Sequence, residues 1–506
     1  MKLFSERSIL FEYTLICVCF GVLYGISCAP GYLWQDSGLI QYRSLNGDFI
    51  GPFGLALSHP LYYVFTIGIT KILPGAFPYS INLLSSFFAT ITIANVYLLV
   101  RIWTNARTPA LISAISLGVA HTFWAHACIA ETYSLWAFLF SLELLCLLFY
   151  DRFNSKGALL CLVVFNGLSL SVHNLSLLSL VCYTGLIAIS VRKKKTTTKT
   201  ALSVLLLWLL SSSLLLSFII HDFVVHGSLS GTIQSALFGT QWQDNVLNHN
   251  LSAKFYKTSL LYLILNFPTL NLLLVFVYLF SVIKKGGKVG CFSWTTIALL
   301  GVFLGFSLRY DVPDRYVFFL PCYMLLALFL GAGAHILSQT AHAKRIELYV
   351  LILSFTPIAA YVIIPSAAQK AQYRLDTRGD VPYRDDFKYF LQPWKGGYQG
   401  AKRFAHESLN QVEPNSLICA DMTTVTPLLL MQEHEGMRPD VQIINSTLGK
   451  QINWESPGQV DKILEQSPLY IVSHKPGYCP KPLLDYPVQS DGILWRVMPS
   501  NRSSID

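Results

Sequence analysis

The stretch that decides the fold runs from Ile9 to Cys28, ILFEYTLICVCFGVLYGISC, and is soon followed by Trp34–Gly38, WQDSG. The first part is as long as a membrane-spanning helix, which needs ~20 mostly apolar residues. We therefore predict that this helix crosses a membrane and delivers Asp36 to the surface in a polar, glycine-bearing loop. A carboxylate held there can act as a base on a substrate that is itself part lipid. The alternative is an ordinary solvated loop carboxylate.

The composition of the whole chain is that of an integral membrane protein. Of its 506 residues, 53% are hydrophobic and only 13% are charged, and the mean hydropathy is +0.48. Soluble domains carry about a quarter charged residues. The net charge of +9 reflects Lys and Arg in short loops between apolar segments, such as Arg192–Lys195, where they set membrane orientation. We expect no nucleic-acid partner.

Common cofactor motifs do not occur in the sequence. It has neither a Walker A nor a GxGxxG pattern, so neither ATP nor a dinucleotide is predicted. A CxxC pair and a His/Cys ligand cluster are also missing, so the sequence carries no strong zinc signal, and a requirement for a divalent metal stays open. Most of the eleven cysteines lie in apolar segments. Cys419 and Cys479 lie in the polar C-terminal region, where a disulfide between them is one possibility.

Apolar segments alternate with basic loops as far as Pro365, which predicts about eleven membrane helices. Lys2 and Arg7 place the N-terminus in the cytoplasm by the positive-inside rule, and we expect the first helix to be a retained signal anchor. Residues 31–79 form a predicted outer loop with an interfacial helix at Leu61–Leu73, a true span being the alternative. The further predicted crossings are 81–100, 110–129, 135–150, 158–172, 175–190, 202–220, 260–283, 291–308, 317–337 and 346–364.

The composition changes after Pro365. Residues 366–506 are rich in Pro, Asp, Gln and Tyr, with short apolar runs at 416–420, 441–444, 469–472 and 493–497 that indicate strands, and a helical pattern at 427–434. We predict a transmembrane catalytic domain at 1–365 and a small extracytoplasmic α/β domain at 366–506.

Ionisable residues gather at the outer ends of the predicted helices, where they are costly to place and often functional. A carboxylate there can deprotonate an incoming hydroxyl, and arginine grips a phosphate through paired hydrogen bonds. The alternatives are that the Asp and Arg residues form a structural network, that His59 caps the interfacial helix, and that His173 satisfies backbone groups. The candidate site residues are Asp36, His59, Glu131, His173, Arg309, Asp311, Asp314 and Arg315.

An ordered series of motifs spreads over most of the chain and is most distinctive at Tyr310–Arg315, YDVPDR. The other stretches are Asp36–Gly38, His59–Tyr62, Thr122–Trp124, Ile129–Tyr133, Gly167–Leu170 with His173, Phe319–Pro321, and Glu435–Asp440 followed by Val441 and Ile443–Asn445. In this order they resemble the protein O-mannosyltransferase-like membrane proteins of the GT-C glycosyltransferase superfamily.

The resemblance implies a GT-C fold and a dolichol- or undecaprenyl-phosphate sugar donor used on the lumenal or periplasmic face. It implies that Asp36 is the catalytic base, that Glu131 is a second acid that positions a substrate, and that Arg309 and Arg315 are candidates for the phosphate. Two departures leave the donor open. Leu39 stands where the family usually has Glu, and Leu61 follows His59-Pro60 directly, without a Pro-Gly-Tyr-Pro segment.

The sequence therefore predicts a glycosyltransferase that moves a mannose-like sugar from a polyprenyl-phosphate donor to an acceptor hydroxyl, with inversion. Protein Ser or Thr is the acceptor favoured by the resemblance. The alternatives are a transferase of the same fold acting on a cell-envelope glycan or lipid, and a transporter or flippase of lipid-linked sugars. The predicted location is the bacterial inner membrane or the endoplasmic reticulum.

Overall fold

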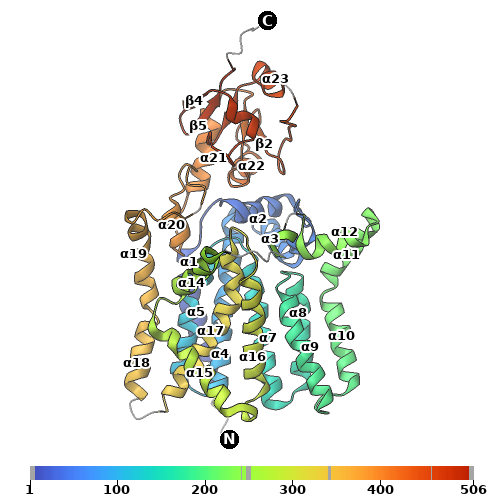
Figure 1. Cartoon of the computed structure of the whole chain (residues 1–506), viewed down its shortest axis with the longest axis vertical. Helices are drawn as coiled ribbons and strands as arrows, with labels where there is room; N and C mark the ends of the chain where they lie inside the picture. Colours follow the sequence, from blue (N-terminus) through green and yellow to red (C-terminus); the bar gives the residue numbers. More distant parts are fainter. Residues whose placement is uncertain are drawn as a thin grey trace.

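The protein is a bundle of helices that carries a small domain on one end (Figure 1). The computed structural model describes residues 6–240, 242–246, 252–339, 343–375, 377–456 and 458–500, so Lys2 lies outside the described residues. The N-terminal end of the described chain lies at one end of the long axis, and its C-terminal end lies at the other, on the side of the small domain. We call the end of the bundle beneath this domain the domain-side end.

Long apolar helices confirm an integral membrane protein. Among the described residues, six helices are long and apolar enough to cross a membrane, and two bent pairs raise the number to eight. The predicted eleven crossings would require three shorter apolar helices to cross as well. The six are α1 (Glu6–Ser27), α4 (Tyr79–Thr104), α7 (Tyr133–Phe153), α15 (Leu273–Lys285) with its flanking turns, α17 (Leu320–Leu337), and α18 (Ala343–Leu353) continued by α19 (Thr356–Lys370).

The bent pairs fall where single straight spans were expected. Helices α5 (Arg107–Gly118) and α6 (His121–Ala127) meet at 68°, and α10 (Thr198–Ser211) and α11 (Ser213–His226) meet at 65°. The three shorter apolar helices are α8 (Lys156–Leu170), α9 (Ser176–Arg192) and α16 (Cys291–Ser307). Between α11 and α15 the described chain forms α12 (Leu229–Phe238), α13 (Gln243–Val246) and α14 (Ala253–Asn266).

Burial separates the centre of the bundle from its rim. In the apolar part of α17, 94% of residues are buried inside the protein, against 17% in α1. An all-round apolar helix suits both places in a membrane, because lipid and protein core are equally apolar. Helix α1 buries Ile16, Phe20 and Tyr24 against the bundle and is also tied to it by polar contacts. Glu12 accepts hydrogen bonds from Arg101 Nε at 3.0 Å and Arg107 Nε at 2.6 Å.

The span predicted at 260–283 is wrong as a single helix. Helix α14 ends at Asn266, and α15 begins at Leu273. Pro268 explains the break, because it lacks a backbone N–H and disfavours the helical conformation of Phe267 before it. Asn266 is the last residue of α14, and its side chain accepts a hydrogen bond from the Thr122 backbone N–H at 2.8 Å. This bond joins α14 to α6.

Residues 31–79 contain two α-helices before α4 begins, rather than one, and both lie at the domain-side end (Figure 1). The interfacial helix expected at Leu61–Leu73 is α3 (Pro60–Ile72), whereas α2 (Gln35–Asn46) was not predicted. Asp36 therefore lies in the first turn of a helix and not in a loop. Helix α2 buries Gln41, Arg43 and two serines beside Leu39 and Ile40. Its buried residues therefore lack the apolar periodicity by which amphipathic helices are recognised.

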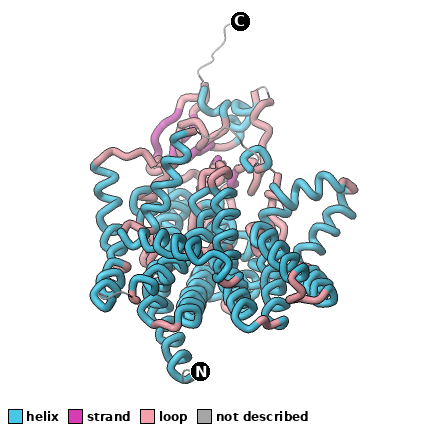
Figure 2. Tube along the Cα trace, turned by 60° about the horizontal axis from the view of Figure 1, so that its bottom comes forward, coloured by secondary structure: helices cyan, strands magenta, loops and turns pink. Residues whose placement is uncertain are grey.

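The C-terminal domain is built on a five-stranded sheet in the order β2-β1-β3-β5-β4, gathered at the end opposite the N-terminus (Figure 2). Strands β1 (Leu417–Cys419), β2 (Gln442–Ile444) and β3 (Leu469–Ile471) are parallel, and β5 (Leu494–Val497) pairs antiparallel with β3 and with β4 (Val488–Asp491). All four predicted strand segments contain a strand, and β4 was missed because its sequence is polar. Cys419 and Cys479 are free thiols.

The helices of this domain are α20 (Asp386–Leu391), α21 (Gly400–Gln411), α22 (Val425–Glu435) and α23 (Gln459–Gln466). Helix α22 is the helix predicted at 427–434. The boundary predicted at 365 falls inside α19, which continues to Lys370.

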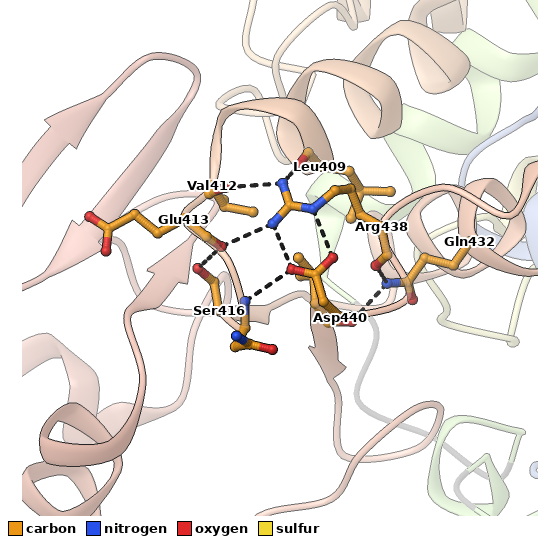
Figure 3. Close-up of polar contacts among 9 residues, drawn as sticks. Leu409, Val412, Glu413, Ser416, Gln432, Arg438 and Asp440 are labelled. Carbon is orange, nitrogen blue, oxygen red and sulfur yellow. Dashed lines mark hydrogen bonds and ion pairs between the residues drawn. The ribbon is translucent and has the colours of Figure 1, made fainter.

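Arg438 joins the elements of this domain, as Figure 3 shows. Its guanidinium donates to the Leu409 and Val412 carbonyls at 2.7 and 3.0 Å, and pairs with Asp440 at 2.8 Å. The Gln432 side chain of α22 donates back to the Arg438 carbonyl at 2.9 Å. The motif that carries part of the family resemblance therefore fixes α22 against the end of α21.

Candidate active site

Asp36 lies one residue after an unusual turn of the backbone. Trp34 precedes α2 with an extended backbone, and Gln35 has φ +53°, a left-handed conformation that costs a non-glycine residue energy and often marks a functional site. The Asp36 side chain remains accessible to solvent, while the surrounding protein raises its pKa because it removes water from the charged form.

Glu131 is the second acid that the structure brings to this place. Its Oε1 accepts a hydrogen bond from the Ser37 hydroxyl at 3.0 Å, so the residue next to Asp36 touches it directly. Glu131 lies between α6 and α7, and its backbone N–H donates to Ser85 of α4 at 3.4 Å. Burial raises the pKa of Glu131 well above its usual range, and the charges of Asp36 and Asp314 raise it further.

Asp314 is the third acid, and it comes from a distant part of the sequence. It immediately precedes the short 3-10 helix η5 (Arg315–Phe319). Burial, followed by repulsion from Asp36, raises the pKa of Asp314 to about 7. Leu39, which replaces an acid of the family pattern, is buried. The chain thus gathers three carboxylates whose like charges oppose full ionisation.

The two predicted histidines form a stacked pair beside these acids. The His59 and His173 rings lie 5.4 Å apart and nearly parallel, and Tyr133 lies 5.2 Å from His173. Although His59 precedes α3, its side chain makes no capping hydrogen bond, and its Nδ1 contacts the Val172 carbonyl at 2.7 Å. Burial lowers the pKa of His59 to about 4 and that of His173 well below its usual value. Both rings are therefore neutral at pH 7.

Arg315 is occupied elsewhere. Its guanidinium donates to Ser259 Oγ at 3.0 Å and to the Phe255 carbonyl at 2.7 Å, and it stacks 3.5 Å above the Phe255 ring. These contacts tie η5 to α14. Arg309 and Asp311 are exposed, and the Asp311 carbonyl accepts a hydrogen bond from Asn245 at 2.6 Å.

Replacing Arg315 with Gln is expected to destabilise the protein by roughly 2–3 kcal/mol, because two buried charge-assisted hydrogen bonds are lost. A lower thermal midpoint in detergent, with the donor KM of surviving protein unchanged, would show this. Arg374→Gln, at an exposed position, is the matched control and should leave both the midpoint and the donor KM unchanged. A raised donor KM for Arg315→Gln at an unchanged midpoint would contradict the structural role.

Two buried cations near the site were not predicted. Arg43 of α2 donates to the Leu57 carbonyl at 3.2 Å and lies 3.8 Å above the Tyr63 ring, and its charge contributes to lowering the pKa of His59. Lys395, from the segment after α20, lies 5.3 Å above the Tyr389 ring, and burial lowers its pKa to about 8. Each is a single basic residue in a polar run, which gives no signal in the sequence.

The arrangement suits proton transfer next to a negatively charged leaving group. Carboxylates with raised pKa values accept and return protons near neutral pH. Within the described parts of the chain, no group of three or more His, Cys, Asp and Glu residues is arranged to hold a metal ion.

Comparisons with known proteins agree with this picture. Residues 58–198 match the family described as the protein O-mannosyl-transferase TMEM260 N-terminal domain, a range that includes His59, Glu131 and His173. No curated protein matches the chain. The fold is similar to that of ArnT from Cupriavidus metallidurans, solved bound to undecaprenyl phosphate, with a TM-score of 0.59 over 97% of this chain and 98% of that chain at 11% identity. The family match bears out the predicted resemblance over residues 58–198, and the likeness to ArnT over the whole chain bears out the predicted GT-C fold.

Proposed function

We propose that the protein transfers a mannose-like sugar from a polyprenyl-phosphate donor to an acceptor hydroxyl. The observation that carries the proposal is the contact between Ser37 and Glu131, which sets Asp36 beside a second acid at one end of a membrane bundle. The lipid-bound ArnT structure supports a lipid-linked donor. The family match supports a sugar donor of the mannose type and a protein Ser or Thr acceptor.

In this proposal Asp36 is the general base. Its carboxylate takes the proton of the acceptor hydroxyl while the hydroxyl oxygen bonds to the anomeric carbon of the sugar. The bond from that carbon to the phosphate oxygen breaks, the polyprenyl phosphate leaves, and the configuration inverts. Glu131, with Ser37, holds the acceptor, and Asp314 supplies the second near carboxylate that Leu39 does not.

We assign contacts with the phosphate and the sugar of the donor to one arginine and two histidines. Arg309 is the proposed phosphate contact, because Arg315 is engaged with α14. The neutral pair His59 and His173 offers a flat surface and hydrogen-bonding edges to the sugar. Asp311 remains a proposed contact at the rim.

We place the reaction on the extracytoplasmic side, in the periplasm or the lumen, with the N-terminus in the cytoplasm. The basic turns between α9 and α10 and between α15 and α16 lie at the end of the bundle opposite α2 (Figure 1). Basic loops face the cytoplasm, and the domain-side end therefore faces away from it.

The test is transfer of labelled mannose from a polyprenyl-phosphate mannose by the purified protein. Label in the protein fraction, at Ser or Thr of an added acceptor, supports the proposal. Label in a glycan or lipid fraction would instead support the same-fold alternative. Movement of the intact lipid-linked sugar across vesicles without any transfer would support a flippase and contradict the enzyme.

A further inference from the structure

The C-terminal domain contacts helix α2 and the turn before it at three positions. The first contact lies just before the N-terminus of the helix. The Trp34 indole Nε1 donates to Tyr398 Oη at 2.6 Å, and its ring lies 5.4 Å from the Phe404 ring of α21. Trp34 is 1% exposed, so water cannot replace this partner. A buried donor without a partner is costly, and the Tyr398 hydroxyl therefore fixes the turn that leads into Asp36.

The second contact is a close approach in the middle of α2. A Cβ on Gly38 would lie 2.4 Å from Thr426 Oγ1 of α22 and 2.4 Å from the Leu33 carbonyl. Both distances are far below van der Waals contact, so only glycine fits at this position. The backbone of α2 thus rests directly on α22, two residues beyond Asp36.

The third contact is a pair of hydrogen bonds at the far end of α2. Glu433 of α22 accepts from Tyr42 Oη at 2.9 Å and from Asn46 Nδ2 at 2.8 Å. Glu435, which follows Glu433 by two residues, accepts from Tyr32 Oη in the segment before α2 at 3.0 Å. Charged acceptors make such bonds stronger than neutral ones.

The two helices that make these contacts are joined to each other. Arg438 and Gln432 connect α22 to the end of α21 (Figure 3); α21 carries Phe404, which contacts Trp34, and α22 carries Thr426 and Glu433, which contact α2. Their contacts lie before, within and after the first two turns of α2, where Asp36 is carried.

We propose that the C-terminal domain is a positioning element of the active site, which holds α2 so that Asp36 meets the acceptor, with Tyr398 and Glu433 as positioning residues. This inference rests on the proposed role of Asp36 as base. Reacting groups must be held within a fraction of an ångström, and a misplacement of about 1 Å can cost about 100-fold in rate. Positioning acts on kcat, whereas a domain that merely bound the donor would act on KM.

The experiment compares Tyr398→Phe and Glu433→Ala with wild type. Each variant is expected to lower kcat about tenfold, with the donor KM changed by less than about twofold. Glu433→Gln keeps an acceptor oxygen and should recover kcat to within about threefold of wild type. Glu465→Ala, an exposed charge removal on α23 of the same domain, is the matched control and should behave as wild type.

Hydrogen exchange provides a readout that does not depend on activity. Amides of residues 35–46 should exchange faster in Tyr398→Phe and Glu433→Ala than in wild type or Glu465→Ala, because α2 has lost its support. Unchanged exchange in α2, full kcat in both variants, or a raised KM at unchanged kcat would each overturn the inference. If wild type itself transfers no sugar, the proposed function fails, while exchange in α2 still decides whether the domain holds this helix.

Discussion

Replacing Asp36 with Asn is expected to lower sugar transfer by about 10²- to 10⁴-fold, the usual contribution of a general base. The side chain keeps its size but can no longer take a proton from the acceptor. Donor binding should survive, because a general base acts on the acceptor. Transfer from a labelled polyprenyl-phosphate sugar, measured alongside binding of the same lipid, checks both parts.

Two further variants make this result interpretable. Asp36→Glu restores a carboxylate at a displaced position and should retain more transfer than Asp36→Asn. Asp485→Asn removes an exposed carboxylate of the C-terminal domain and should have no effect. Full transfer by a correctly inserted Asp36→Asn protein would remove Asp36 from the mechanism.

Replacing Asp314 with Asn is expected to shift the acidic limb of the kcat profile downward by about one pH unit. The charge of Asp314 raises the pKa of Glu131, and Asp36 and Asp314 repel each other. Removing one negative charge lets the remaining carboxylates lose their protons at lower pH. The profile of kcat between pH 4 and pH 9 measures the shift, and an unchanged limb would separate Asp314 from the other two acids.

The same substitution should change how stability depends on pH. The folded-state pKa of Asp314 is about 7, against 3.8 for a free aspartate. Between these values the folded protein holds more protons than the unfolded chain, so stability falls as the pH rises through this window. Asp314→Asn removes this loss, and its thermal midpoint should decline less than that of wild type between pH 4 and pH 7. Asp485→Asn again serves as the control.

The membrane character and the strands of the C-terminal domain were predictable because they depend on local pattern. Long apolar runs leave few alternatives to a spanning helix. Helix α2 was not predictable, since its buried face is polar and is satisfied by distant groups such as Asn82, whose side chain bonds to Gln41 at 3.0 Å.

The candidate site also has residues that could be predicted from local sequence and residues whose roles depend on distant contacts. Asp36 and Glu131 were grouped because both follow apolar segments on the same predicted side, and the Ser37 contact places Glu131 beside α2. The role of Arg315 at the phosphate stays a prediction that the sequence could not refine, because its observed partners on α14 lie 56 to 60 residues earlier in the chain. Nothing in the YDVPDR motif distinguishes an arginine that turns towards another helix from one that faces a substrate.

The hydrogen bond between Trp34 and Tyr398 also affects when during synthesis the active site can form. The two residues are 364 positions apart, so at translation rates of 5–20 residues per second Tyr398 is made about 20 to 70 seconds after Trp34. During that interval the nascent chain already contains Asp36 but lacks Tyr398, which fixes the turn before Asp36. If the C-terminal domain positions Asp36 as proposed, the protein becomes competent for transfer only once this domain has folded, and a chain that stops before Tyr398 is inactive.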